Sequence, residues 1–124
     1  MAEIRRAGKA DILKLAHGVF DAYRVFYKQT SDPVGAEKFL EERMEMEQSV
    51  IFVAEIDGEI VGFTQIYPLY SSVRMKRLLQ LNDLFVGVEY RGRGISKALI
   101  EAAKSLCREW DSCGLILETD KINV

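Results

Sequence analysis

The sequence predicts a mixed α+β domain in which one sheet is covered by helices. Three observations predict this class. First, two strand-like runs flank an Asp-Gly pair at residues 57–58. Second, a strand-like run at residues 78–86 leads through a glycine-rich turn into a long stretch with apolar residues at helical spacing. Third, an apolar run at residues 115–118 follows that predicted helix. A chain of 124 residues is long enough for one core, so we expect residues 1–124 to form a single domain.

The first elements are a strand and two helices. Residues 3–7 form a short alternating segment, as expected of a strand. From Lys9 onward, apolar residues recur every three or four positions and so share one helical face. They are Ile12, Ala16, Val19, Tyr23 and Phe26. A second helix begins at Pro33, because Asp32 is a good N-cap and proline suits the first helical turn.

A β-hairpin follows the two helices. At Val50 the sequence changes to β-branched and aromatic residues, and residues 57–58 supply the positive φ angles of a type I′ turn. Residues 50–67 are therefore expected to form two antiparallel strands. Residues 71–77 are polar and basic, and they predict an exposed connection to the next strand.

The C-terminal part predicts one β-α-β unit. Residues 78–86 are apolar on both faces, which indicates a central strand. Apolar positions then recur at helical spacing until Cys113-Gly114, and residues 115–118 form another buried strand. The helical stripe consists of Ile95, Ala98, Leu99, Ala102, Leu106 and Trp110. The two strands should run parallel with a right-handed crossover, beside an otherwise antiparallel sheet.

Composition excludes several classes of function. The net charge is -2, from 17 basic and 19 acidic residues, so the chain lacks the basic excess expected of a nucleic-acid-binding protein. No apolar run is long enough to cross a bilayer, and no secretory signal precedes the fold. Cys107 and Cys113 lack a metal-ligand pattern. We therefore expect a cytoplasmic protein with reduced thiols, no metal, no membrane contact and no nucleic-acid partner.

The turn before the last helix has the features of an anion-binding cradle. It reads Arg91-Gly92-Arg93-Gly94 at a helix start, where backbone N–H groups lack intrahelical partners and the helix dipole adds positive charge. A phosphate can satisfy both, glycine allows its close approach, and guanidinium groups match its oxygens. Glycine-rich turns also occur for steric reasons alone, and the spacing by itself does not separate the two interpretations.

Two common nucleotide-binding motifs do not fit this turn. A P-loop requires G-x-x-x-x-G-K-[ST], which the segment lacks. A dinucleotide-binding G-x-G-x-x-G beginning at Gly92 would need glycine where Lys97 stands. Glu118 stands near the position of a ribose-binding acid, but that fold also requires several successive β-α-β units.

The stretch LNDLFVGVEYRGRGISKALIEAA, residues 81–103, resembles motif A of the GCN5-related N-acetyltransferase (GNAT) family. The family's loop pattern is [Q/R]-x-x-G-x-[G/A], and residues 91–96 match it except that Ser96 replaces Gly or Ala. The order of the other elements, the Asp-Gly hairpin and LILETDKIN at residues 115–123 match as well. The resemblance implies a GNAT-like acyl-CoA N-acyltransferase fold, with a mostly antiparallel central sheet and one parallel pair of strands.

The resemblance also implies acetyl-CoA as cofactor. Its pyrophosphate would lie on the loop residues, and its pantetheine arm would pair with the end of the central strand. The residues so assigned are Arg91, Gly92, Arg93, Gly94, Ile95 and Ser96 for the pyrophosphate, and Leu84, Phe85, Val86 and Asn123 for the arm. A backbone N–H near Phe85 or Val86 would polarise the thioester carbonyl.

The implied reaction is direct acetyl transfer to a primary amine, which belongs either to a small molecule or to a protein. The amine must lose a proton before it attacks, and Asp83 is the nearest carboxylate on the central strand. Asn82 stands where some polyamine-acetylating relatives have a glutamate, and strand alternation places Asn82 and Asp83 on opposite faces. A purely structural role for Asp83 stays open. Glu118 and His17 are weaker candidates for the base.

Four tyrosines are candidates for the acceptor site, although aromatic residues of this kind also serve as core. They are Tyr23, Tyr27, Tyr67 and Tyr70. A cluster of glutamates on the second helix would suit a cationic acceptor, and a solvated helix face explains it equally well. These glutamates are Glu41, Glu42, Glu45 and Glu47.

The chain departs from the family after Asn123. Family members usually continue with a helix, which carries a tyrosine that protonates the leaving thiolate, and a final hairpin, whereas this sequence ends at Val124 after its fifth predicted strand. The resemblance therefore implies a C-terminally truncated domain with an open sheet edge. We expect a homodimer or higher oligomer to cover that edge. The alternative function is a non-catalytic acyl-CoA-binding or regulatory module.

Overall fold

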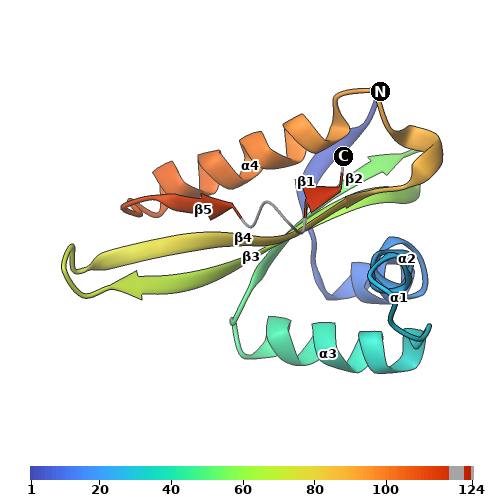
Figure 1. Ribbon diagram of the computed structural model, residues 1–124, viewed down its shortest axis with the longest axis horizontal. Coiled ribbons are helices and arrows are strands. Elements are labelled where there is room, and N and C mark those ends of the chain that lie inside the picture. The colour runs from blue at the N-terminus through green and yellow to red at the C-terminus, as the bar shows by residue number, and fades with distance from the viewer. Residues whose placement is uncertain (118–121, 124) are drawn as a thin grey trace.

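The computed structural model describes residues 1–117 and the backbone of residues 122–123 (Figure 1). It confirms the α+β class and the order of the predicted elements, with two departures: the first predicted helix is divided, and a further short strand follows the last predicted one. In chain order the elements are β1 (Glu3–Arg6), α1 (Ile12–His17), α2 (Val19–Phe26), α3 (Pro33–Glu45), β2 (Val50–Ile56), β3 (Glu59–Ser71), β4 (Lys76–Val86), α4 (Ile95–Glu109), β5 (Leu115–Leu117) and β6 (Ile122–Asn123). Short 3-10 turns at Lys9–Asp11 and Val88–Tyr90 precede α1 and follow β4.

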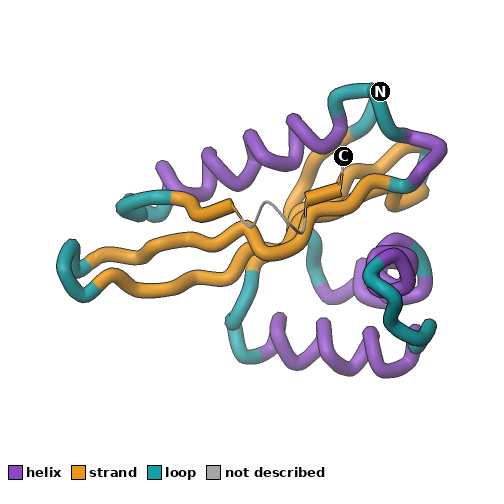
Figure 2. Tube along the Cα trace, viewed as in Figure 1, coloured by secondary structure: helices purple, strands orange, loops and turns teal. Residues whose placement is uncertain are grey.

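The sheet has the strand order β1-β2-β3-β4-β5, and β6 also pairs with β4. Strands β1 to β4 are antiparallel neighbours, whereas β5 and β6 run parallel to β4. Helix α4 covers one face of the sheet, and α1, α2 and α3 cover the other (Figures 1 and 2). Each face therefore has its own apolar core, and β4 lies centrally as predicted.

The helical region after Lys9 is divided, whereas the apolar spacing predicted one continuous helix. Gly18 separates α1 from α2, and its N–H donates to the carbonyl of Leu15. A Cβ at Gly18 would lie 2.8 Å from the carbonyl oxygen of Lys14, so the turn requires glycine. The next helix agrees with its prediction, because the Asp32 side chain accepts a hydrogen bond from the N–H of Gly35 at 3.0 Å.

The predicted Asp-Gly hairpin is confirmed. Asp57 and Gly58 have φ angles of 49° and 80°, as a type I′ turn requires, and β2 pairs with β3. The expected connection at residues 71–77 is shorter than predicted, because β3 extends to Ser71 and pairs there with Lys76. Pairing continues through this polar stretch because the hydrogen bonds that form it come from the backbone.

Strand β5 is less buried than its apolar sequence predicted. Ile116 and Leu117 are 41% and 39% exposed. The reason is that β5 lies at the edge of the sheet path and pairs with β4 on one side. Strand β5 therefore leaves apolar side chains exposed at this edge.

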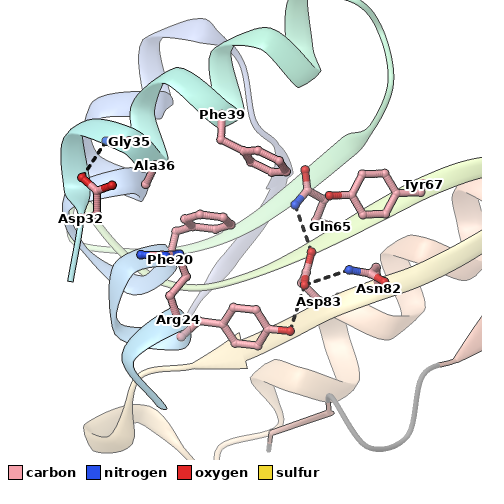
Figure 3. Close-up of a pocket in the computed structure, with 11 residues that line it drawn as sticks. Phe20, Arg24, Asp32, Gly35, Ala36, Phe39, Gln65, Tyr67, Asn82 and Asp83 are labelled. Carbon is pink, nitrogen blue, oxygen red and sulfur yellow. Dashed lines mark hydrogen bonds between the residues drawn. The ribbon is translucent and has the colours of Figure 1, made fainter. Parts of the chain in front are cut away.

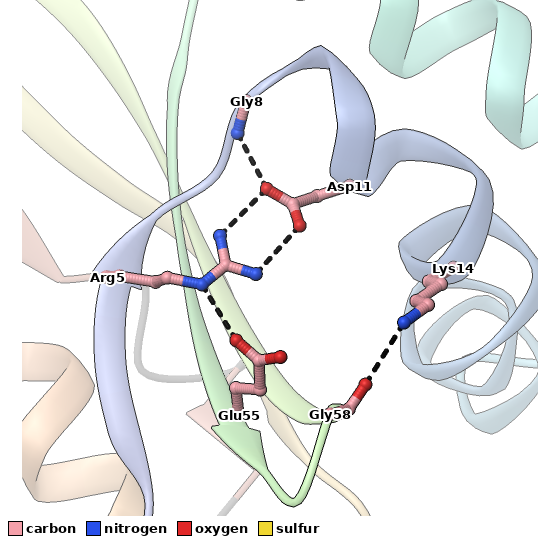
Figure 4. A network of polar contacts seen from close by, with 6 residues as sticks. All are labelled: Arg5, Gly8, Asp11, Lys14, Glu55 and Gly58. Carbon is pink, nitrogen blue, oxygen red and sulfur yellow. Dashed lines mark hydrogen bonds and ion pairs between the residues drawn. The ribbon is translucent and has the colours of Figure 1, made fainter.

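A polar network ties the start of the helical layer to the sheet (Figure 4). The guanidinium group of Arg5 on β1 makes a bidentate contact with Asp11 at 2.8 and 2.9 Å and a further contact with Glu55 of β2 at 2.8 Å. The N–H of Gly8 also donates to Asp11. Hydrogen bonding from Arg5 is the main cause that lowers the pKa of Asp11 to about 2.

Candidate active site

Asn82 and Asp83 face the same pocket because β4 contains a bulge between its central residues. Gln65 of β3 pairs with Asp83, whereas the next residue, Ile66, pairs with Leu81, so Asn82 is the extra residue. The side-chain amide of Asn82 donates to Oδ1 of Asp83 at 3.1 Å. The expectation that strand alternation separates these two side chains is therefore wrong, because alternation is interrupted at the bulge.

The bulge opens into a pocket of about 380 Å³ between α2, α3 and the sheet (Figure 3). Aromatic side chains from both helices and from β3 surround it. Its lining consists of Phe20, Tyr23, Arg24, Asp32, Gly35, Ala36, Phe39, Gln65, Tyr67, Asn82 and Asp83. Gln65 and Asp83 are its most deeply buried polar residues, at 1% and 8% exposure.

Among the described residues, the donors to the Asp83 carboxylate are all neutral. Oδ1 accepts from the Tyr23 hydroxyl at 2.9 Å and from Asn82, and Oδ2 accepts from Nε2 of Gln65 at 3.0 Å. Within the described chain, no lysine, arginine or histidine forms an ion pair with it. A buried carboxylate with hydrogen-bond donors but no opposite charge can receive an incoming cation.

Sequence reasoning missed Ser49 and Gln65. The hydroxyl of Ser49 donates to Oε1 of Gln65 at 2.8 Å, and both side chains are buried. The available signal was the pair Thr64-Gln65 within the otherwise apolar second strand of the hairpin, since buried polar side chains require partners.

The structure brings only two of the four predicted tyrosines into the pocket. Tyr23 and Tyr67 line it. Burial and the charge of Asp83 raise the pKa of Tyr23, and the same causes raise the pKa of Tyr67 to about 12. Both phenols therefore stay protonated near neutral pH. Tyr27 packs edge-on against Tyr23 without lining the pocket, and Tyr70 is 77% exposed on the β3–β4 hairpin.

Other acidic and basic candidates lie elsewhere. His17 is exposed and contacts Glu37, with 2.6 Å between Nε2 and Oε2. None of the four glutamates of the predicted acidic cluster lines the pocket. Glu118 lies outside the described residues. Asp83 is thus the carboxylate that both lines the pocket and lies on the central strand.

The glycine-rich loop forms a second hollow, of about 220 Å³, at the other end of the same stretch of β4. Gly92 and Gly94 have φ angles of 78° and 80°, a conformation that side-chain-bearing residues rarely adopt. The N–H of Ala98 bonds to the carbonyl of Gly94. In the described chain, the amides of residues 92–97 have no such acceptor, so they are available to an anion.

The two loop arginines differ in their surroundings. Nε of Arg91 donates to the carbonyl of Val86 at 2.9 Å, and its guanidinium group lies over the Phe85 ring. Its Nη2 is buried and has no hydrogen-bond partner among the described residues. Arg93 is exposed, lies over the Tyr90 ring and donates to a backbone carbonyl at 3.3 Å. Arg91 is therefore the better-placed donor for a bound phosphate oxygen.

The end of β4 joins the pocket to the loop. Leu84, Phe85 and Val86 lie between them and are buried. Strand β6 runs parallel to this segment, with Ile122 beside Leu84 and Asn123 beside Phe85. The side chain of Asn123 lies outside the described residues. Val86 is the third residue after Asp83, a span of roughly 10 Å along a strand.

Two classes of site are absent from the described part of the chain. No group of three or more His, Cys, Asp or Glu residues there could hold a metal ion. None of its helices is long and apolar enough to span a bilayer.

Comparison with known proteins gives a consistent result. The family model described as "Acetyltransferase (GNAT) family" matches residues 16–124. The chain is 46% identical over 120 residues to "Uncharacterized N-acetyltransferase YhfO" of Bacillus subtilis, covering 97% of this chain and 80% of that protein. It is 35% identical over 101 residues to a "Probable acetyltransferase" of Haemophilus influenzae, covering 81% of this chain and 69% of that one.

Solved structures agree with the sequence relatives. The "Crystal structure of a probable acetyltransferase" superposes with a TM-score of 0.88 at 36% identity, covering 94% of this chain and 78% of that chain. A ribosomal-protein-alanine N-acetyltransferase from Brucella melitensis biovar Abortus superposes with a TM-score of 0.82 at 24% identity, covering 95% and 79%, which shows the fold alone.

Proposed function

The chain belongs to the GNAT family of acetyltransferases, and from that premise we propose that it transfers the acetyl group of acetyl-CoA to a primary amine by direct attack. The observation that carries this proposal is the Asp83 carboxylate. It is buried on the central strand, held by neutral donors and directed into a pocket beside the strand end that leads to the glycine-rich loop.

The residues present fit a diphosphate-bearing cofactor. Among the described residues, the amides of residues 92–97 and Nη2 of Arg91 have no partner, so they provide donors at a helix start. Acetyl-CoA supplies the acetyl group as an activated thioester. Leu84–Val86 would hold the pantetheine arm, with a backbone N–H of Phe85 or Val86 toward the thioester carbonyl. Because β6 lies beside Leu84 and Phe85, we expect β6 to give up this pairing when the arm binds.

Asp83 would act as the base. An amine is mostly protonated at neutral pH, and the carboxylate accepts the proton that the amine must lose. The amine nitrogen then bonds to the acetyl carbon, and the carbon–sulfur bond breaks. Amide formation releases a second proton from the nitrogen, which neutralises the departing thiolate, and Asp83 returns the first proton to solvent. Tyr23, Gln65 and Asn82 keep the carboxylate directed at the pocket while this happens.

The lining favours an acceptor with one ammonium group on an apolar body. Three charged residues line the pocket, Arg24, Asp32 and Asp83, which leave one net negative charge. Asp32 is engaged as a helix cap, so the carboxylate available to an amine is Asp83. The aromatic walls provide apolar surface and attract a cation to their faces. An acceptor with several ammonium groups would meet Arg24 and would lack partners for its additional charges.

The alternative is a non-catalytic acyl-CoA-binding module, and the place of β6 on the β4 edge is the observation that favours it. A thiol-release assay with acetyl-CoA and a panel of amines separates the two. We expect thiol release that depends on a monoamine and is lost in Asp83→Asn, with coenzyme A binding retained in both proteins by calorimetry. Binding without thiol release for every amine would support the alternative.

A further inference from the structure

Gln65 is a buried amide in a place where an apolar residue would pack more simply. It is 1% exposed, lies in the middle of β3 and is the cross-strand neighbour of Asp83. Its hydrogen-bond partners are Ser49, just before β2, and Asp83 on β4. A chain of polar side chains therefore runs from the residue before β2, through β3, to the β4 carboxylate proposed as the base.

The two hydrogen bonds of Gln65 orient its amide. The Ser49 hydroxyl donates to Oε1 at 2.8 Å, which leaves Nε2 to donate to Oδ2 of Asp83 at 3.0 Å. An ionised carboxylate can only accept hydrogen bonds, whereas a protonated one also donates. The observed direction of the amide therefore matches the ionised carboxylate. The reversed amide would place Oε1 against Asp83, an arrangement that only the protonated form satisfies.

The two oxygens of Asp83 are not equally supported. Oδ1 accepts from both Tyr23 and Asn82, whereas among the described residues Gln65 is the donor to Oδ2. Removal of Gln65 would leave Oδ2 without a donor from the described chain. Removal of Asn82 would still leave one donor on Oδ1. Gln65 is accordingly the donor whose loss would leave one oxygen of Asp83 without a hydrogen bond from the described residues.

Resting on the proposed role of Asp83 as base, we propose that Gln65, bonded to Ser49, is a positioning residue that keeps a donor on Oδ2 of Asp83 and the carboxylate directed at the acceptor amine. Because Ser49 can either donate or accept, the Ser49–Gln65 pair can reverse when Asp83 takes up the amine's proton, which keeps every buried group bonded in both states. The pair thus lets Asp83 exchange one proton without an unsatisfied polar atom.

Other charged and titratable groups line the pocket beside Asp83, and they enter the interpretation of any pH profile. Helix α2 contributes Tyr23 and Arg24, and the N-cap of α3 contributes Asp32. Strand β3 contributes the Tyr67 phenol, whose titration is influenced by both Asp83 and Arg43 of α3. None of these groups changes in the variants of Gln65 and Ser49, so differences between those variants and the native protein report on the Ser49–Gln65 pair.

The test compares Gln65→Met and Ser49→Ala with Thr64→Val as a matched control. Thr64 is equally buried and bonds to Asp83 at 2.7 Å, but to its backbone carbonyl. In Gln65→Met we expect the acid limb of kcat/KM to move to higher pH, because a donor to the ionised form is lost. Near neutral pH kcat/KM should fall about tenfold, with KM for acetyl-CoA unchanged. Ser49→Ala should move the limb in the same direction by less, and Thr64→Val should lose stability without moving it.

A second readout needs no turnover. The side-chain amide resonances of Gln65, followed by NMR against pH in the protein alone, should report protonation of Asp83, and this response should vanish in Asp83→Asn. Two results would overturn the inference. One is an acid limb of kcat/KM that does not move in folded Gln65→Met and Ser49→Ala; the other is a pH response of the Gln65 amide resonances that persists in Asp83→Asn. An inactive native protein would contradict the proposed function instead. The NMR result would then decide the inference about Gln65.

Discussion

The hydroxyl of Tyr23 donates a 2.9 Å hydrogen bond to Oδ1 of Asp83, across a sequence separation of 60 residues. The bond joins helix α2 to the bulge of the central strand, and it places an aromatic wall of the pocket against its carboxylate. The Tyr23 ring also packs edge-on against Phe63 and Phe85, at centroid distances of 5.5 and 5.8 Å. Ring packing and a hydrogen bond thus both position Tyr23, and a mutation that removes only the hydroxyl separates their contributions.

Replacing Tyr23 with phenylalanine should preserve the aromatic packing and remove the hydrogen bond. We expect a loss of about 1–3 kcal/mol in the free energy of unfolding, since the partner is a buried charged group. Urea denaturation gives the measurement. Tyr67→Phe is the matched control, because Tyr67 lines the same pocket without a bond to Asp83 in the described structure. Equal losses in the two variants would contradict a specific contribution of the Tyr23–Asp83 bond.

Replacing Asp83 with asparagine should remove the proposed base and keep the size of the side chain. We expect kcat/KM to fall by roughly a hundredfold or more, as for loss of a general base. Coenzyme A affinity, measured by calorimetry, should stay unchanged because the glycine-rich loop is not altered. Retention of full activity would show that the amine loses its proton to another group.

Alanine at Gly94 should weaken coenzyme A binding by distorting the loop. The residue has a φ of 80°, and open space surrounds it, so backbone strain rather than a clash opposes the side chain. Gly58→Ala is the control, since Gly58 has the same φ of 80° in the distant hairpin turn. Both variants should lose about 1 kcal/mol of stability. Only Gly94→Ala should raise the Kd for coenzyme A, and equal Kd values would argue against the loop as the diphosphate site.

Stability should fall in strong acid as the Arg5–Asp11 contact is lost. The folded-state pKa of Asp11 is lowered from its ordinary value of 3.8 to about 2, chiefly by hydrogen bonding to Arg5. Because the folded pKa is depressed, this contribution is fully present above about pH 4 and disappears as the pH falls through about 2. The lowered pKa corresponds to a contribution of about 2 kcal/mol to the free energy of unfolding. Solvent screening of the partly exposed Arg5 reduces this contribution to about 1 kcal/mol.

The measurement is urea denaturation between pH 2 and 5 for the native protein and for Asp11→Asn. The Asp11→Asn variant should be less stable at pH 5 and should lose less stability on acidification. Asp57→Asn serves as the control, because asparagine also tolerates the positive φ of the type I′ turn. A native pH dependence identical to that of Asp11→Asn would show that this carboxylate does not contribute.

Association through the β5 edge is the last expectation. Ile116 and Leu117 present apolar side chains at 41% and 39% exposure on a strand at the edge of the sheet path. Sedimentation should therefore detect a homodimer or larger oligomer at micromolar concentration, and Ile116→Lys should shift it toward monomer. A native protein that sediments as a folded monomer would contradict this expectation.

The sequence alone determined the α+β class, the Asp57-Gly58 hairpin, the Asp32 cap and the glycine-rich turn, because each depends on residues close together in the chain. Sequence also singled out Asp83, but not its surroundings. The tertiary structure decided that Asn82 and Asp83 share a face and that Ser49, Gln65 and Tyr23 meet at the carboxylate. The physical reason is that a bulge shifts side-chain alternation by one residue, and that strand register and helix packing are set by contacts between distant segments.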